Sequence, residues 1–128
     1  MRYLLDTHTL LWSIINPHPL SKTALKLLQD DANSFLVSAA SAWEIATKVR
    51  LGKLPGAEAL ELDFLPEIQR LGYALLSIEA AIALRAGRFT ASHGDPFDRI
   101  IAAQALDLDI PIISIDAKLD AFGIRRIW

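Results

Sequence analysis

The sequence predicts an α/β fold in which a mostly parallel central sheet of about five strands is flanked by helices. Two observations lead to this prediction. Short apolar runs of strand length alternate along the chain with runs whose apolar residues recur at helical spacing, and this alternation is typical of parallel sheets covered by helices. Apolar residues also make up 52% of the 128 positions, which is enough for a substantial core. We therefore expect residues 1–128 to form a single domain.

Five elements are expected in the amino-terminal part of the chain. As strand, helix, helix, strand and helix, they are Arg2–Asp6, Thr7–Ile15, Lys22–Gln29, Ser34–Ser38 and Ala40–Leu51. The first helix has an apolar stripe and is ended by two prolines, Pro17 and Pro19. Ser21 can cap the second helix through its side-chain oxygen, and Gly52 ends the third.

Seven further elements are expected after residue 60. As helix, strand, helix, helix, strand, helical turn and edge strand, they are Leu62–Leu71, Tyr73–Ile78, Glu79–Ala86, Pro96–Leu106, Ile112–Ile115, Lys118–Phe122 and Arg125–Trp128. Pro66 lies inside the first of these and should kink or interrupt it, because proline lacks the N–H that a helix interior uses. Asp95 followed by Pro96 is a typical helix start.

The composition excludes several kinds of site and partner. The chain has no cysteine, so disulfides, thiolate zinc sites and cysteine nucleophiles are excluded. The net charge is −2, so a nucleic-acid substrate would need a metal and a local basic rim to attract it. Arg2 and Asp6 interrupt any signal-peptide core, and no uncharged apolar run reaches the length of a membrane span. We expect a soluble, cytoplasmic protein.

Four carboxylates stand where they can meet at one edge of the sheet. Asp6 closes the first strand and Asp116 the strand at 112–115, while Glu44 and Asp98 lie on helices. In α/β proteins the site lies in the crevice outside the carboxyl ends of the strands. Each pair of like charges about 5 Å apart there costs roughly 3 kcal/mol at an effective dielectric near 20. Such a cluster must take up protons or hold a cation, and oxygen ligands favour Mg²⁺ or Mn²⁺.

Each of these acids also has an ordinary structural explanation. Asp6 can cap the helix that follows it, and Glu44 can form a surface pair with Lys48 four residues later. Asp98 can complement a helix dipole, and Asp116 can initiate a turn. A shared site explains all four positions with a single cause, so we prefer it.

Other residue types give weaker signals. No serine or cysteine elbow accompanies the three histidines, and no glycine-rich phosphate loop is present. His93 lies close to the predicted site, and we interpret it as an ordinary loop residue, with substrate contact as the alternative. Trp12 and Trp43 lie on predicted helices, so each should either pack in the core or line a groove. Asp95 is assigned to helix capping.

Four segments of the chain match the motifs of a known family, in the order in which that family has them. They are LLDTHTLLW at 4–12, SAASAWEI at 38–45, HGDPFDR followed by IAAQA within 93–105, and ISID at 113–116. On these segments the chain resembles PIN-domain ribonucleases, and more narrowly the VapC toxins of type II toxin–antitoxin pairs. The third segment is the most specific, and the resemblance runs from Tyr3 to Trp128.

The resemblance implies a three-layer PIN-like fold and an endoribonuclease that uses Mg²⁺ or Mn²⁺ to cleave RNA phosphodiester bonds. By position it implies that the metal ligands and catalytic residues are Asp6, Glu44, Asp98 and Asp116. The metal would bind the scissile phosphate and activate a water for in-line attack. Asp95 and Ser114 would support these ligands, Ser114 by holding a ligand water or by orienting a carboxylate.

The resemblance also implies partners. The candidates for RNA contacts, all of them basic residues near the acids in sequence, are Arg99, Lys48, Lys118, Arg50 and Lys53. A co-encoded antitoxin would neutralise the toxin through a tail that lies in an apolar groove. The candidate anchors for such a tail are Leu11, Trp12 and Trp43. A homodimer is expected as well.

Two alternatives stay open at this point. A phosphate-transfer domain of the receiver or haloacid-dehalogenase type also has an aspartate after its first strand. Here, however, His8 stands where a dehalogenase needs a second aspartate, and Leu5 stands where a receiver has an acid. A non-catalytic interaction module with a PIN-like fold is the other alternative. Such modules usually lose one or more of the acids, whereas all four are present in this chain.

Overall fold

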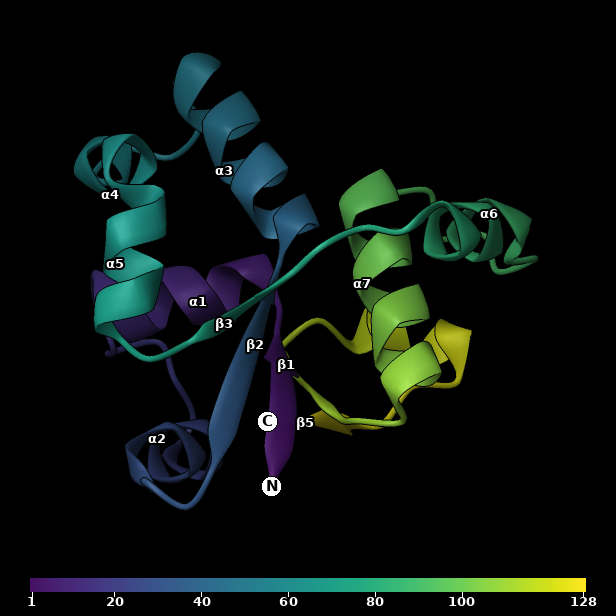
Figure 1. The fold of residues 1–128 in the computed structure, drawn as a ribbon, viewed down its shortest axis with the longest axis horizontal. Coiled ribbons are helices and arrows are strands. Elements are labelled where there is room, and N and C mark those ends of the chain that lie inside the picture. The colour runs from purple at the N-terminus through teal and green to yellow at the C-terminus, as the bar shows by residue number, and fades with distance from the viewer.

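The protein, described here by a computed structural model of residues 1–128, has a five-stranded sheet with helices on both faces (Figure 1). The strands β1 to β5 are Arg2–Leu5, Ser34–Ser38, Ala74–Leu76, Ile112–Ile113 and Arg126–Ile127. The helices α1 to α7 are Thr7–Ile14, Lys22–Gln29, Ala39–Arg50, Glu58–Leu62, Phe64–Arg70, Ala80–Arg88 and Pro96–Leu108. A 3₁₀ helix, η1, spans Ala117–Phe122.

All strand pairs are parallel, and the order across the sheet is β3-β2-β1-β4-β5. The central strand β1 is in register with both neighbours, since Leu5 is opposite Val37 on one side and Ile113 on the other. Parallel strands all end at the same edge of a sheet. The predicted fold class is therefore confirmed, and with it the requirement that the acid-bearing strand ends lie together.

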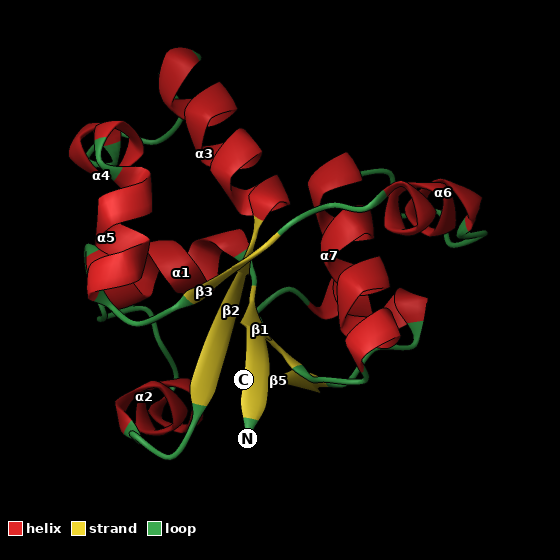
Figure 2. Ribbon diagram, viewed as in Figure 1, coloured by secondary structure: helices red, strands yellow, loops and turns green.

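Successive residues of β1 face opposite layers, as the pleat of a strand requires. Tyr3 and Leu5 belong to one buried cluster, which includes residues of α1, α3, α4 and α5. Leu4 belongs to a second cluster, with Ile101 and Ile112, under α7 and η1. In Figure 2 the helices lie on both sides of the strands, with α1, α2, α4 and α5 on one side and α6 and α7 on the other. The expected three-layer arrangement is confirmed.

The predicted helix at 62–71 is present as the shorter α5. A further helix that was not predicted, α4, precedes it, and Asp63 separates the two with φ −109° and ψ 30°. Pro66 does not interrupt α5, because it is the third residue of that helix. The first four N–H groups of a helix have no partner within it, so proline in this turn costs no hydrogen bond.

Four of the five strands are shorter than the sequence predicts, and β3 and β4 differ most. Only Ala74–Leu76 of the run 73–78 pairs with β2, and β4 ends at Ile113 rather than at Ile115. Ile115 is 49% exposed, because the chain leaves the sheet at Ser114 and passes over its edge. The predicted edge strand is present as β5. None of the helices combines the length and apolar content that crossing a bilayer requires.

Candidate functional site

The four acids predicted from the sequence line one cleft of about 120 Å³. It lies beyond the carboxyl ends of β1 and β4, beside residues 44–48 of α3 and the start of α7. A fifth acid joins them, so that five of its nine lining residues are carboxylates. The lining residues are Asp6, Thr7, His8, Glu44, Lys48, Asp95, Asp98, Ile115 and Asp116. Residues from four separate segments of the chain thus meet around one small space.

Asp6 is buried where β1 ends and α1 begins. Its Oδ1 accepts a hydrogen bond from the backbone N–H of Thr9 at 2.7 Å, so the expected capping role is confirmed. Its Oδ2 accepts a hydrogen bond from the hydroxyl of Ser114. Burial raises the pKa of Asp6, and the hydrogen bonds from Ser114 and Thr9 oppose that rise. The two interpretations of Asp6 are compatible, because one carboxylate both caps the helix and lines the cleft.

Ser114 connects two of the acids. While its hydroxyl donates to Asp6, its oxygen accepts the backbone N–H of Asp116 at 3.0 Å. Asp116 in turn accepts the backbone N–H of Lys118 at 3.0 Å and so caps η1. Of the two roles expected for Ser114, orientation of a carboxylate is the one that these contacts provide.

Glu44 is only 3% exposed and is one of the four buried residues of α3, with Ala40, Ser41 and Ile45. Its Oε2 is 2.5 Å from Nζ of Lys48, one turn later in α3. The pair expected from the sequence is present, but it lies in the acidic cleft rather than on the open surface. Lys48 is therefore the one permanent cation among the residues that line the cleft.

Asp98 lies in the first turn of α7, below the cap that Asp95 provides. Asp95 Oδ1 accepts the N–H groups of Phe97 at 2.9 Å and of Asp98 at 3.2 Å, which confirms its predicted capping role. Burial raises the pKa of Asp98 to about 6; a hydrogen bond from His93 opposes the rise, and the charges of Asp95 and Glu44 add to it. The acids are therefore close enough to oppose one another's ionisation.

His93 belongs to this site, which corrects our interpretation of it as an ordinary loop residue. Its Nε2 lies 2.9 Å from Asp98 Oδ2. Possible ligand atoms of His93, Asp98 and Asp116 all lie within 4.8 Å of one another. The imidazole also packs against the ring of Phe122, with centroids 5.7 Å apart. The sequence held a signal for this, because His93 shares one short segment with Asp98.

Arg99 makes its hydrogen bonds within the protein, and its contact with RNA stays a prediction. Its guanidinium donates five hydrogen bonds to the last turns of α6 and to the loop that follows that helix. The acceptors are the carbonyl oxygens of Ala86, Gly87, Phe89, Ala91 and His93. It also lies over the rings of Phe89 and Phe122, at 5.8 and 5.9 Å from their centroids. Arg99 therefore fixes the loop that carries His93.

The other predicted contact residues do not all line one pocket. Lys118 is exposed and does not line the cleft. Leu11 and Trp12 line a neighbouring pocket together. Trp43 does not line that pocket; it is 54% exposed and packs edge-on against Phe97, with ring centroids 4.6 Å apart. Of the three residues expected to line an antitoxin groove, Leu11 and Trp12 therefore share a pocket, and the place of Trp43 in such a groove stays a prediction.

The donors present in the cleft suit a hard divalent cation. Carboxylate and hydroxyl oxygens dominate the lining, and Mg²⁺ and Mn²⁺ prefer oxygen ligands. Five acids face a single lysine, and mutual repulsion contributes to the raised pKa of Asp98. A bound cation would relieve that repulsion, so the residues of the cleft fit the metal that the sequence predicts.

Comparisons with known proteins agree with this geometry. A family model described as "PIN domain" matches residues 3–124, which confirms the resemblance drawn from the four motifs. The chain is 48% identical over 56 residues to Ribonuclease VapC16 of Mycobacterium tuberculosis (strain ATCC 25618 / H37Rv). That match spans 43% of this chain and 39% of the length of the relative.

Several solved structures have a similar fold. VapBC2 from Rickettsia felis, bound to a DNA fragment from its promoter, has a TM-score of 0.69 at 16% identity, over 99% of this chain and 98% of that chain. VapBC-1 from nontypeable Haemophilus influenzae has a TM-score of 0.64 at 18% identity, over 99% and 97%. FitAcB from Neisseria gonorrhoeae has a TM-score of 0.62 at 19% identity, over 100% and 97%. At these identities the likeness shows the fold alone.

Proposed function

The chain belongs to the PIN domain family, and from that premise we propose that it is a divalent-cation-dependent endoribonuclease, the toxin of a type II toxin–antitoxin pair. The observation that carries the proposal is the cleft, in which five carboxylates surround about 120 Å³ beside a single lysine. The 48% identity to a segment of Ribonuclease VapC16 supports the choice of RNA as the substrate.

Four carboxylates would hold Mg²⁺ or Mn²⁺, and these are Asp6, Glu44, Asp98 and Asp116. When bound, such a cation supplies positive charge to the scissile phosphate and lowers the pKa of a water for attack. Without this charge, the acidic cleft would repel the phosphodiester. Metal binding and RNA binding should therefore be coupled.

The protein's own residues would fix the geometry of this chemistry. Ser114 holds the carboxylate of Asp6 in one orientation, and its contact with the N–H of Asp116 ties the two acids together. Lys48 would neutralise Glu44 and offer its remaining N–H donors to a phosphate oxygen at the rim of the cleft. Asp95 would act only through the start of α7, by keeping Asp98 in the helix turn that faces the cleft.

A purified sample tests the catalytic proposal directly. We expect cleavage of single-stranded RNA in Mn²⁺ or Mg²⁺, none in EDTA, and 3′-hydroxyl ends on the products, because water attack expels the 3′ oxygen. Contaminating ribonucleases that leave cyclic phosphates would be recognised by their product ends. Four variants should each lose cleavage and metal affinity while staying folded: Asp6→Asn, Glu44→Gln, Asp98→Asn and Asp116→Asn. Equal cleavage by wild type and Glu44→Gln would reject the proposal in favour of a non-catalytic module.

We also propose that a co-encoded antitoxin neutralises the protein by covering the acidic cleft. We propose further that the protein is a single cytoplasmic domain and forms a homodimer. The likeness of the fold to proteins solved as VapBC complexes supports the partner. Co-expression with the neighbouring reading frame should yield a complex that does not cleave RNA. If the complex cleaves RNA as fast as the free chain, neutralisation at this cleft is rejected. Light scattering on the free chain gives its molar mass and so tests for the homodimer.

A further inference from the structure

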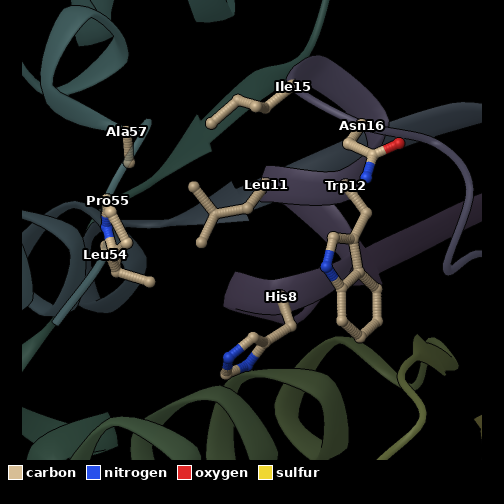
Figure 3. A pocket seen from close by; sticks show the side chains of 8 residues that line it. All are labelled: His8, Leu11, Trp12, Ile15, Asn16, Leu54, Pro55 and Ala57. Atoms are coloured by element: carbon tan, nitrogen blue, oxygen red, sulfur yellow. The ribbon is translucent and has the colours of Figure 1, made fainter.

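A pocket of about 270 Å³ lies beside the acidic cleft, on α1 and the segment before α4 (Figure 3). In Figure 3, Leu11 lies between Trp12 on one side and Leu54 and Pro55 on the other, with His8 at one end. The full lining is His8, Leu11, Trp12, Ile15, Asn16, Leu54, Pro55 and Ala57. No carboxylate, lysine or arginine is among these residues. The pocket therefore suits an uncharged flat group rather than a phosphate.

The pocket and the acidic cleft share a wall. His8 lines both of them, because it follows Asp6 by two residues at the start of α1. His8 is exposed, and its ring lies 5.6 Å from the ring of Trp12. A polymer whose phosphate lies among the acids would reach the pocket by passing a single side chain. The occupant of the pocket is therefore expected to be the group next to that phosphate.

Two features of the lining match the way single-stranded nucleic acids are recognised. Trp12 offers an aromatic surface, and its position is supported by Trp128, with ring centroids 5.8 Å apart. Asn16 Oδ1 already accepts the N–H of His18 at 3.2 Å, so its amide nitrogen is free to donate, and in Figure 3 that nitrogen points toward Trp12. Proteins hold unpaired bases by stacking them on aromatic rings and by hydrogen-bonding their edges.

We propose that this pocket is a subsite for one nucleobase of the RNA, that of a nucleotide flanking the cleaved bond; the proposal rests on the proposed function. The base would stack on Trp12 and accept a hydrogen bond from the amide of Asn16. The volume is slightly below the roughly 300 Å³ at which pockets for drug-sized ligands begin, so it takes one ring system and not a length of chain. A protein segment could use the same apolar walls, and the test below separates the two occupants.

Base removal provides the test, because it deletes the ring and keeps the phosphate. An RNA oligonucleotide cut at one bond is prepared with an abasic site on either side of that bond. In wild type, one of these sites should lower kcat/KM about tenfold, the order expected for one base stacked on an aromatic ring. In Trp12→Leu that penalty should shrink to within about twofold, whereas Trp12→Phe, which keeps a ring, should retain it.

Two further variants keep the test decisive if Trp12→Leu melts early. Asn16→Ala changes an exposed residue and should reduce the penalty about threefold, the effect of one lost hydrogen bond. His18→Ala, an exposed histidine just outside the pocket, should leave it unchanged. The subsite proposal is overturned if the abasic site lowers kcat/KM equally in wild type, Trp12→Leu and Asn16→Ala. It is also overturned if these variants lose affinity for the antitoxin but cleave RNA as wild type does. A wild type that cleaves no RNA would instead reject the proposed function, and the subsite with it.

Discussion

The hydroxyl of Ser114 donates a hydrogen bond to Asp6, although the two residues lie 108 positions apart in the chain. They meet because β1 and β4 are parallel neighbours that end together, with Leu5 opposite Ile113. A serine two residues before the last acid therefore controls the orientation of the first one. The contact joins the two strand ends from which the cleft is built.

Replacing Ser114 should weaken metal binding more than the loss of one hydroxyl suggests. Ser114→Ala leaves a buried carboxylate oxygen of Asp6 without its donor, so we expect a loss of about 1–3 kcal/mol in stability and about a tenfold loss in Mn²⁺ affinity. Ser114→Thr should preserve both. Calorimetric titration with Mn²⁺ measures the affinity. Ser38→Ala, which removes a buried capping hydroxyl away from the acids, is the matched control; an equal loss of affinity there would contradict the prediction.

Stability of the metal-free protein should fall as pH rises through the acid range. Burial raises the pKa of Asp98 from 3.8 to about 6 and raises that of Asp6. The folded protein therefore binds these protons more tightly than the unfolded chain, so their stabilising effect is present at low pH and is lost from about pH 4 to about pH 6. Asp98→Asn should flatten this decline. Urea unfolding in EDTA at a series of pH values measures it, with Asp107→Asn, an exposed acid on the same helix, as control. A slope equal to that of wild type in Asp98→Asn would refute the assignment.

Asp95 should behave as a cap and not as a metal ligand. Asn accepts the same N–H groups, so Asp95→Asn should keep the stability and most of the cleavage, whereas Asp95→Ala should cost about 1 kcal/mol. Thermal unfolding and cleavage rates of both variants separate these roles. If Asp95→Asn lost as much cleavage as Asp98→Asn, Asp95 would have to be counted among the ligands.

Arg99→Lys should destabilise the protein despite keeping the charge. Lysine has a single nitrogen and cannot reach all five carbonyl oxygens, which belong to the end of α6 and to the loop after it, so we expect a loss of about 2 kcal/mol or more. Amide exchange in residues 89–93 should accelerate, because Arg99 no longer fixes that segment. Arg88→Lys, on the exposed end of α6, is the control and should change neither quantity. Unchanged exchange in Arg99→Lys would show that the loop holds itself in place.

Part of the cleft could be predicted because the positions of some of its residues depend only on their neighbours in the sequence. An acid directly after an apolar strand must lie at the strand's end, so Asp6 could be placed from the sequence. Asp116 lies near the same edge although β4 ends at Ile113, because its N–H is held by the hydroxyl of Ser114. The caps were predictable for the same reason, since Asp95 and Ser21 act on N–H groups two or three residues away.

The contacts that the sequence did not reveal depend on how distant segments pack. Nothing near Arg99 in the sequence shows that the preceding loop folds back over its guanidinium and satisfies it. The separation of Trp43 from Trp12 likewise depends on the direction that α3 takes away from the sheet. His93 was undervalued because its contact with Asp98 follows from the path of that same loop.

The order of strands across the sheet has a consequence for how the protein is made. β4 is the fourth strand to be synthesised, yet it lies directly beside β1, so Ser114 and Asp116 reach the cleft only after more than a hundred residues that follow β1 have been made. Pairings between segments so far apart in sequence also form late, because closing the long loop between them opposes folding. A growing chain on the ribosome therefore lacks a complete set of acids until residue 116 has emerged, and the cleft cannot be assembled before that point.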